Sequence, residues 1–240
     1  MDRQDGRQCN QLRPVLIDTS IRSWAEGAAL ITMGATTVLC SATVEDRVPP
    51  HRRGSRTGWV TAEYAMLPRS THERSPRERG GRIDSRSQEI QRLIARSLRA
   101  AVDLSRLGER TVTIDCDVIH ADGGTRTAAI SGGYVALALA CRKLQEAAMV
   151  QTSPIVRQVA AVSVGLLDST PILDLDYLED SRVSTDINLV MSADGGLIEV
   201  QGTAEREPFS EDKLGVLIGL ARGGIVEIVA AQTRALAPDY

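Results

Sequence analysis

The spacing of apolar residues along the first half of the chain predicts a series of strands. The runs 28–33 and 37–44 are rich in β-forming residues, and the turn at Gly34 between them predicts a hairpin. Further strands are predicted over 59–66 and 111–119, and in the second of these apolar and polar residues alternate. Alternation of this kind indicates a sheet with one buried face and one face in contact with water.

A helix is predicted over 86–105, where apolar residues recur on one face at helical spacing. Ser85, followed three residues later by Gln88, has the form of a capping box at the start of this helix. Three arginines fall on the opposite face, namely Arg92, Arg96 and Arg99. A solvated surface is the ordinary explanation for a basic stripe on a helix.

The second half of the chain alternates apolar helices with strands. Helices are predicted over 128–147 and over 210–221. A strand over 159–167 is followed by two runs, 186–191 and 197–200, and a turn containing Asp-Gly-Gly joins these runs. The turn and the two runs together predict a second hairpin.

Composition is typical of a soluble globular protein, with 42% hydrophobic and 25% charged residues in 240. No linker or long repeat divides the chain, so we expect a single domain over 1–240. No apolar run approaches the ~18 residues of a membrane span and no signal segment begins the chain, so we expect a cytoplasmic protein without a membrane partner. Four cysteines lack metal-binding spacing and are expected to be reduced core residues: Cys9, Cys40, Cys116 and Cys141.

The net charge of −3 conceals an uneven distribution of charged residues. Residues 47–110 carry 15 basic and 7 acidic side chains, whereas residues 150–240 carry 6 basic and 14 acidic ones. The basic part includes the segments 47–58 and 68–82, whose Arg, Pro, Gly and Ser content predicts exposed loops. If the basic and acidic parts face one cleft, that cleft can hold a polyanion and metal ions together.

A glycine turn connects the strand predicted over 111–119 to the apolar helix that follows it. The turn reads Asp-Gly-Gly-Thr-Arg-Thr over residues 122–127. A strand, a glycine turn and a helix present backbone N–H groups and the positive end of a helix dipole to an anion. Many such turns bind nothing, but the presence of Thr125 and Arg126 in this one favours a phosphate or sulfate site.

Two carboxylates in the acidic third flank a short polar break. Asp180 ends the run 172–180 and is expected to leave a strand there, and Asp186 is expected to enter the strand 186–191, so that their side chains can converge. Paired carboxylates suit both the binding of a hard divalent cation and general acid catalysis. Most acidic residues near turns are simply solvated, and spacing alone favours that interpretation.

Five blocks of the sequence, in the correct order and spread over nearly the whole chain, resemble the ribonuclease PH family. They are Leu12–Val15, Gly58–Pro68, Gln88–Ile94, Asp122–Ala129 and Glu199–Glu205. The resemblance implies a phosphate-dependent 3′ to 5′ exoribonuclease that trims tRNA precursors and other RNA 3′ ends. It would release nucleoside 5′-diphosphates and add nucleotides in the reverse reaction. The implied fold is α+β, with mixed β-sheets and flanking helices like those of ribosomal protein S5 domain 2.

The resemblance also implies partners and a set of site residues. Inorganic phosphate is the co-substrate, and the chain is expected to form a homohexameric ring built as a trimer of dimers. The family's phosphate site falls on Arg86, Gly124, Thr125 and Arg126. Its acidic pair falls on Asp180 and Asp186, which would either hold Mg²⁺ or protonate the departing 3′ oxygen. Its RNA contacts fall on Arg69, Arg74 and Arg77 of the basic loop, with Arg92 and Arg99 as further candidates.

Four positions depart from the family pattern. Ser85, Ala95 and Arg206 replace usual glycines, and Ile187 replaces a usual methionine. Ser85 precedes a phosphate-site arginine and can alter its backbone, while Arg206 adds charge beside the acidic region. None of the four removes a residue to which the resemblance assigns chemistry.

Two other functions remain open at this stage. A non-catalytic RNA-binding ring subunit would lack the acidic pair or the phosphate arginines, and this chain has both. A hydrolytic metal-dependent exonuclease would release nucleoside monophosphates without using phosphate. The three histidines, His51, His72 and His120, share no motif, which disfavours covalent catalysis.

Overall fold

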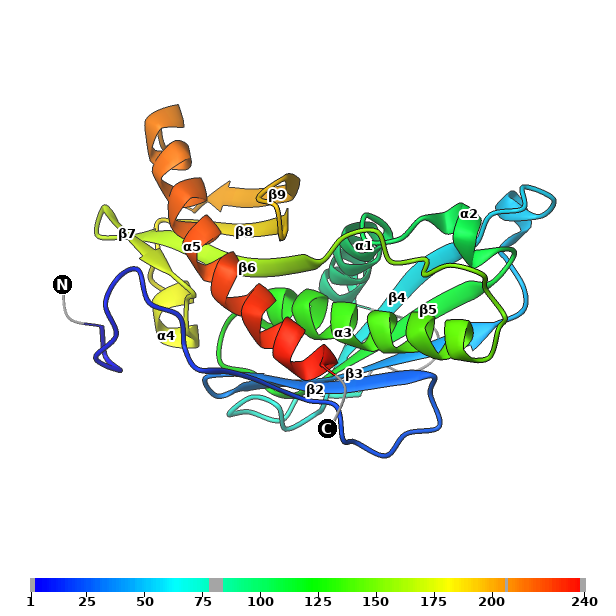
Figure 1. Ribbon diagram of the computed structural model, residues 1–240. Helices are drawn as coiled ribbons and strands as arrows, with labels where there is room; N and C mark the ends of the chain where they lie inside the picture. The colour runs from blue at the N-terminus through cyan, green and yellow to red at the C-terminus, as the bar shows by residue number, and fades with distance from the viewer. Residues whose placement is uncertain (1–2, 78–83, 206, 238–240) are drawn as a thin grey trace.

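The computed structural model describes residues 3–77, 84–205 and 207–237 (Figure 1). A five-stranded sheet has the order β1-β2-β3-β5-β4, in which only β4 and β5 run parallel. Its strands are β1 (Val15–Asp18), β2 (Gly27–Met33), β3 (Thr36–Glu45), β4 (Trp59–Met66) and β5 (Thr111–His120). The predicted hairpin is confirmed, and Gly34 at its turn has a φ of 58°.

A second, four-stranded sheet is antiparallel throughout and has the order β7-β6-β8-β9. Its strands are β6 (Val159–Leu167), β7 (Thr170–Leu173), β8 (Thr185–Ser192) and β9 (Leu197–Ala204). The hairpin predicted from the Asp-Gly-Gly turn is therefore confirmed as β8 and β9. Together the two sheets and their helices form the mixed α+β architecture expected from the sequence.

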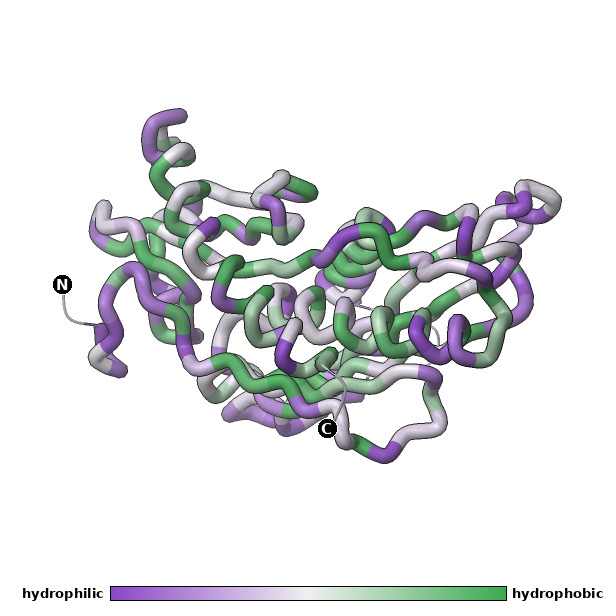
Figure 2. Tube along the Cα trace, in the orientation of Figure 1, coloured by the Kyte–Doolittle hydropathy of each residue, from purple (hydrophilic) through white to green (hydrophobic). Residues whose placement is uncertain are grey.

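The helices are α1 (Ser85–Arg99), α2 (Leu104–Leu107), α3 (Thr125–Glu146), α4 (Tyr177–Asp180) and α5 (Glu211–Leu236), with a 3₁₀ turn at Pro50–Arg52. Helix α3 packs on β2 and β3 of the first sheet and on β6 of the second (Figure 1). Most of its residues between Thr125 and Leu144 are buried, because it is covered on more than one side. Figure 2 shows the hydrophobic segments gathered around this central helix.

One continuous hydrophobic core joins both sheets through α3. Three of the four cysteines lie in this core as free thiols, as the sequence predicts, while Cys9 is only partly buried. Cys40 and Cys116 stand directly opposite each other on β3 and β5, beneath α3. The contact with Cys40, together with burial, raises the pKa of the Cys116 thiol, so it stays protonated in this core.

The helix predicted over 86–105 begins at Ser85, within one residue of the prediction, but it ends at Arg99, six residues early. Asp84 is the N-cap, so Ser85 already lies inside α1 and forms no capping box as the N-cap residue. Helix α1 ends at Arg99, because the chain that follows pairs with another segment. Backbone hydrogen bonds join Asp103 to Pro154 and Val156 to Ala101, and these contacts turn the chain away from the helix axis.

Two other boundaries near the site differ from the sequence-based expectation. Helix α3 begins at Thr125, three residues earlier than predicted, so Thr125 and Arg126 belong to its first turn. Asp180 does not leave a strand but ends α4. A capping box between Asp176 and Glu179 starts this short helix, and its local hydrogen bonds favour a helical turn over an extended chain.

Helix α5 extends to Leu236 instead of ending near 221. Its buried side continues past the glycine pair at 223–224, since Gly224 packs closely against Leu173 and Leu12. Among the described residues it is the one helix with the length and apolar composition to cross a membrane, although a third of its most apolar window is buried in the fold. Its buried side packs mainly on β6, β7, β1 and α3.

Candidate active site

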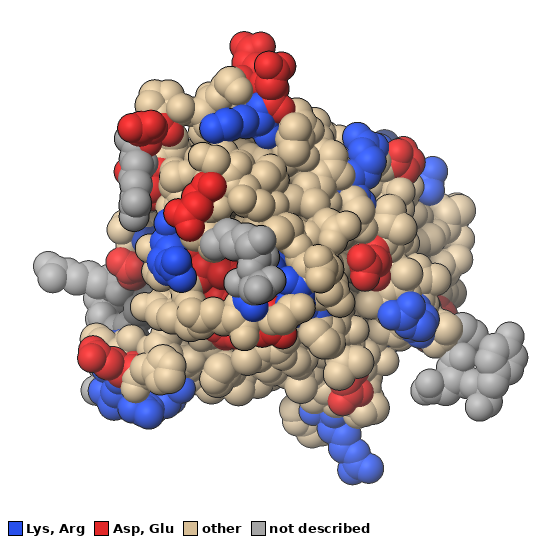
Figure 3. All heavy atoms as spheres, turned by 90° about the vertical axis from the view of Figure 1, so that its left-hand side faces the viewer, with Lys and Arg blue, Asp and Glu red and all other residues tan. Residues whose placement is uncertain are grey.

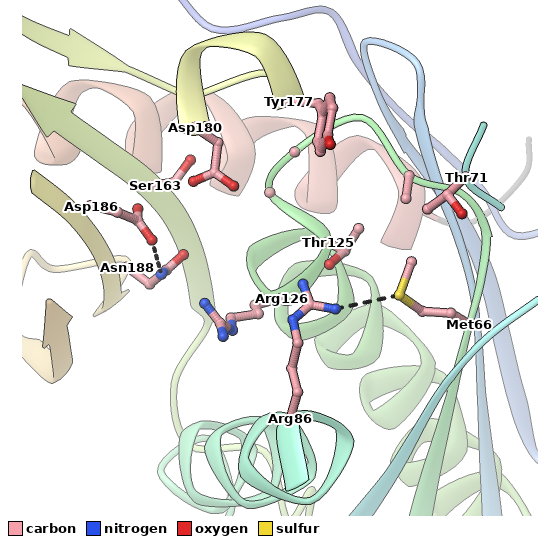
Figure 4. Close-up of a pocket in the computed structure, with 13 residues that line it drawn as sticks. Met66, Thr71, Arg86, Thr125, Arg126, Ser163, Tyr177, Asp180, Asp186 and Asn188 are labelled. Carbon is pink, nitrogen blue, oxygen red and sulfur yellow. Dashed lines mark hydrogen bonds between the residues drawn. The ribbon is translucent and has the colours of Figure 1, made fainter. Parts of the chain in front are cut away.

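One pocket, with a volume of about 280 Å³, collects all six residues predicted to bind phosphate or to form the acidic pair. These are Arg86, Gly124, Thr125, Arg126, Asp180 and Asp186. Figure 4 shows Arg86 reaching into the pocket from α1 and Arg126 from the start of α3, with Asp180 and Asp186 facing them from α4 and β8. Three stretches of the chain that are distant in sequence therefore meet at one site: α1, the start of α3, and the consecutive elements α4 and β8.

The glycine turn between β5 and α3 forms the floor of one half of the pocket. Gly123 and Gly124 both have left-handed backbones, with φ values of 71° and 65°. A Cβ atom at Gly124 would lie 3.0 Å from Nη2 of Arg13, and one at Gly123 would overlap the carbonyl oxygen of Leu175. The turn thus requires glycine for both conformation and space, and it leaves the start of α3 open to an anion.

A buried arginine, Arg13, supports the turn from the protein interior. The guanidinium of Arg13 donates to the carbonyl oxygen of Asp122 and to both carboxylate oxygens of Asp174, the latter at 3.0 and 2.7 Å. Arg13 and Asp174 are almost fully buried, and the carboxylate beside Arg13 raises the pKa of that guanidinium despite its burial. Thr36 completes the support, because its hydroxyl donates to the carbonyl oxygen of Gly123 at 2.6 Å.

Two arginines and a threonine hydroxyl supply the positive and polar groups of this half. Nη2 of Arg126 donates to a carboxylate oxygen of Glu89 at 3.1 Å, and its Nε is buried without a hydrogen-bond partner in the described chain. Arg86 contacts the sulfur of Met66 at 3.5 Å, and no carboxylate of the described residues forms an ion pair with it. The hydroxyl of Thr125 accepts a hydrogen bond from Tyr64 at 2.9 Å.

The acidic half of the pocket contains two carboxylates in unlike surroundings. Burial raises the pKa of Asp186 to about 6, and the charge of Asp180 adds to the shift. Burial also raises the pKa of Asp180, against the opposing charges of Arg126 and Arg86. One oxygen of Asp186 accepts from the Asn188 amide at 3.4 Å, whereas Oδ1 is buried with no hydrogen-bond partner among the described residues.

The basic and acidic parts of the chain therefore contribute side chains to the same pocket, which is the condition under which one cleft can hold a polyanion and metal ions together. Arg86 comes from the basic part and the two aspartates come from the acidic part, and all three line the same pocket. On the face shown in Figure 3, acidic and basic side chains lie beside one another. A site of this kind can bind an anion on one wall and a cation on the other.

The predicted RNA-contacting arginines lie outside this pocket. Arg69 lines an adjoining hollow that shares Thr71, Ala121 and Tyr177 with the main pocket. Arg74 and Arg77 are exposed on the loop that follows.

Arg92 and Arg99 line a separate groove beside Trp59. The guanidinium of Arg99 stacks over the Trp59 ring at 4.5 Å, and that of Arg52 stacks over it at 4.7 Å. Arg99 is thus partly packed, and the interpretation of the helix stripe as a purely solvated surface is wrong for this member.

Several residues of the pocket were not singled out from the sequence. Asn188 stands two residues after Asp186 on β8, so the alternation of strand residues places both on the same side. Tyr177 is an aromatic residue at the start of α4, and more than half of it is exposed at the edge of the pocket. Ser163 on β6 and Thr71 complete the polar lining, and no sequence pattern marks either one.

The departures from the family pattern are accommodated without loss of the pocket. Ser85 is exposed in the first turn of α1, and Ala95 is buried on that helix. Ile187 is buried on β8, and a Cβ atom at the facing Gly202 would lie 2.7 Å from it. Arg206 lies outside the described residues.

Comparisons with family models and with known protein sequences point to the same family. Residues 11–143 match domain 1 and residues 157–224 match domain 2 of the 3′ exoribonuclease family. The chain is 54% identical over 236 residues to the ribonuclease PH of Methylobacterium radiotolerans, covering 98% of this chain and all of that protein.

Solved structures show the same fold at low sequence identity. The Archaeoglobus fulgidus exosome with RNA bound to its active site contains a chain with a TM-score of 0.80 and 21% identity, covering 95% of this chain and 91% of that one. An archaeal exosome core contains a chain with a TM-score of 0.78 and 19% identity, covering 97% of this chain and 91% of that one.

Proposed function

The chain belongs to the ribonuclease PH family of 3′ exoribonucleases, and on that premise we propose that its pocket is where inorganic phosphate attacks the last phosphodiester of an RNA. The protein is a phosphate-dependent 3′ to 5′ exoribonuclease that trims tRNA precursors and releases nucleoside 5′-diphosphates. The reverse reaction adds nucleotides to RNA 3′ ends. The proposal concerns which residues of this chain perform each part of the reaction.

The attacking phosphate binds at the glycine turn. Arg86 and Arg126 supply the cationic donors, and the backbone of Gly124 and Thr125 supplies the start of α3. Phosphate and the RNA phosphodiester are both anions, so their approach requires fixed positive groups. Support comes from the buried Nε of Arg126, which has no hydrogen-bond partner in the described chain and which an anion in the pocket would satisfy.

Asp180 and Asp186 fit a Mg²⁺ ion by the chemistry of their oxygen atoms. Mg²⁺ prefers oxygen ligands, and proteins often bind it through one or two carboxylates together with substrate phosphates and water. The buried Oδ1 of Asp186 has no hydrogen-bond partner among the described residues, so it is free to act as an oxygen ligand of the ion. When bound, such an ion supplies positive charge to the reacting phosphate and to the departing 3′ oxygen.

Instead of binding a metal ion, one member of the pair Asp180 and Asp186 can act as a proton donor. A carboxyl whose pKa is raised to about 6, as burial and Asp180 raise that of Asp186, holds a proton closer to neutral pH than an ordinary aspartate does. In that role one carboxyl protonates the 3′ oxygen as the phosphodiester bond breaks and the bond to the attacking phosphate forms. Asn188 orients Asp186 in either case.

RNA is held outside the pocket by arginines. We assign this role to Arg69, Arg74 and Arg77 of the loop after β4, and also to Arg92 and Arg99 on α1. Arg69 supports the assignment because it lines the hollow next to the phosphate pocket. Guanidinium groups bind phosphates of the RNA backbone without reading its bases.

A homohexamer, built as a trimer of dimers, is the proposed assembly. Large apolar side chains remain exposed on α5, including Val216 and Val226, and on the first part of the chain, including Leu16 and Trp24. Apolar surface of this kind is buried when copies of a chain associate. A ring would also present several basic loops to one structured RNA.

Convergence of Arg126 with Asp180 and Asp186 in one pocket is the observation that carries the proposal. If Arg126 binds the attacking phosphate, Arg126→Ala should raise the phosphate concentration for half-maximal rate far more than it weakens RNA binding. Arg126→Lys should restore phosphate use only in part, because a point charge does not reproduce a two-pronged contact. Steady-state rates at varied phosphate and RNA binding at equilibrium measure the two effects, and equal losses of both would contradict the assignment.

A further inference from the structure

Glu89 on α1 lies where three elements meet beside the pocket. One of its carboxylate oxygens accepts a hydrogen bond from Nη2 of Arg126 at 3.1 Å. The other accepts from the side-chain amide of Gln201, on β9, at 2.5 Å. Glu89 does not itself line the pocket, yet it contacts a residue that does. Its contacts therefore join α1 to α3 and to the second sheet.

The contact with Glu89 restrains the orientation of Arg126. An arginine side chain is long and has many rotamers, so an ion pair through one nitrogen removes much of its freedom. The side chain of Arg126 is only 25% exposed, and its Nε is buried without a partner in the described chain. With Nη2 bound to Glu89, the rest of the guanidinium is left to face the pocket (Figure 4).

The second contact ties this orientation to the acidic half of the pocket. Gln201 stands opposite Asn188 in the pairing of β9 with β8, and Asn188 donates to Asp186. A chain of contacts thus runs from Arg126 through Glu89 and Gln201 to the strand that carries Asp186. Removal of Glu89 would therefore both release the Arg126 side chain and break the connection between Arg126 and β9.

We infer that Glu89 is a positioning residue that presents the Arg126 guanidinium to the attacking phosphate. The inference rests on the proposed function, because it takes Arg126 as a phosphate ligand. Glu89 acts through Arg126 and touches no reacting atom. The role is one of geometry: the carboxylate accepts a hydrogen bond and thereby fixes the direction of a cationic donor.

Glu89 also has a second effect on phosphate binding, which opposes the first and makes the inference testable. Its negative charge, close to the pocket, disfavours a bound anion by simple repulsion. If repulsion dominated, removal of Glu89 would tighten phosphate binding. If positioning dominates, removal weakens it, and a side chain that keeps the acceptor oxygen but not the charge retains most of the binding.

A matched control lies about two turns further along α1. Arg96 donates to Glu199 on β9 at 3.2 Å, so this pair also links α1 to β9. Neither residue contacts Arg126 or lines the pocket. Glu199→Ala removes one carboxylate and one link between the same two elements, as Glu89→Ala does, but it leaves Arg126 held in place.

The experiment measures phosphate binding by calorimetry and the phosphate dependence of the rate for four variants of the full chain: Glu89→Ala, Glu89→Gln, Glu199→Ala and Arg126→Ala. We expect Glu89→Ala to weaken phosphate binding and raise the phosphate KM by about 10- to 100-fold, by analogy with the loss caused by removing a group that orients a metal-binding side chain. Glu89→Gln should stay within a few-fold of the parent chain. Maximal rate at saturating phosphate and binding of RNA should change far less, and Glu199→Ala should leave all values near those of the parent.

The outcomes separate this inference from the function on which it rests. Unchanged or tighter phosphate binding in Glu89→Ala, with Arg126→Ala still impaired, would overturn the role of Glu89 alone. An equal weakening in Glu199→Ala would also overturn it, because the effect would then come from the link between α1 and β9. Normal phosphate binding in Arg126→Ala would instead contradict the phosphate site itself.

Discussion

The two carboxylates of the pocket differ in what surrounds them, although the sequence presents them as an equivalent pair. Asp186 is the more buried, and its Oδ1 has no hydrogen-bond partner among the described residues. Burial and the charge of Asp180 raise its pKa to about 6. Asp180 has two arginines opposing the effect of its burial. A carboxylate left in this state is costly to the fold and useful to a site that binds a cation.

Replacement of either carboxylate should abolish chemistry and spare binding. Removing a group that holds a catalytic ion or transfers a proton costs about 10²-fold or more in rate. Asp180→Asn and Asp186→Asn should therefore fold, bind RNA and nearly lose both phosphorolysis and the reverse reaction. Rates of diphosphate release together with RNA affinity measure this, and near-normal turnover in both variants would show that the pair takes no part in the chemistry.

Stability should depend on pH through Asp186. Its folded-state pKa of about 6 lies above the ordinary 3.8, so the folded chain binds this proton more tightly than the unfolded chain does. The carboxyl therefore costs no stability below about pH 4, and its cost grows as the pH rises to about 6. The cost reaches at most about 3 kcal/mol, since each unit of pKa difference corresponds to about 1.36 kcal/mol. Without added metal, Asp186→Asn should raise the Tm at pH 8 and change it little at pH 4. A gain of equal size at both pH values would contradict this account.

At the scale of elements, strands were easier to predict than the ends of helices. The alternation along β5 and the hairpin signals follow from side-chain period and turn chemistry, which are local properties. The end of α1 is not local, since it depends on pairing of residues 101–103 with 154–156. Helix α5 continues past its glycine pair because Gly224 fits closely against Leu173, a contact that the sequence does not reveal.

The same division applies to the site: its local features were predictable from the sequence, and its contacts between distant segments were not. The glycine turn could be recognised because strand, glycines and helix follow one another in the chain. Convergence of Asp180 and Asp186 was expected for the wrong reason, since Asp180 ends a helix held by a capping box. Glu89 and Gln201 could not be linked to Arg126 from the sequence, because their contacts join segments more than 30 residues apart.

The loop after β4 should govern RNA affinity and leave chemistry intact. Arg69, Arg74 and Arg77 are exposed there, so alanine at all three should cost little stability. Binding of tRNA precursors should weaken, and the slope of log affinity against log salt should flatten by about 0.7 to 0.9 for each RNA phosphate that the variant no longer neutralises. A short single-stranded oligonucleotide should be degraded almost normally. Full tRNA affinity with an unchanged salt slope would mean that the loop is only solvated.

At the scale of the whole molecule, the exposed apolar side chains on α5 should be covered by other copies. We expect a homohexamer with dimers as the smaller unit, measured by light scattering at micromolar concentration. Substitution of Val226 by a charged residue on α5 should shift the population toward smaller species, since it places charge on surface that association would bury. A monomer at all concentrations for the parent chain would contradict the proposed assembly.

The identity of the released product tests the central claim most directly. The purified chain is incubated with an RNA 3′ end, with and without inorganic phosphate, and the nucleotides released are resolved by chromatography. If phosphate bound at Arg86 and Arg126 is the attacking group, nucleoside 5′-diphosphates should appear only when phosphate is present, and their yield should rise with its concentration. Nucleoside monophosphates released without phosphate would show hydrolysis instead, and RNA binding with no product in either condition would show a subunit that only binds.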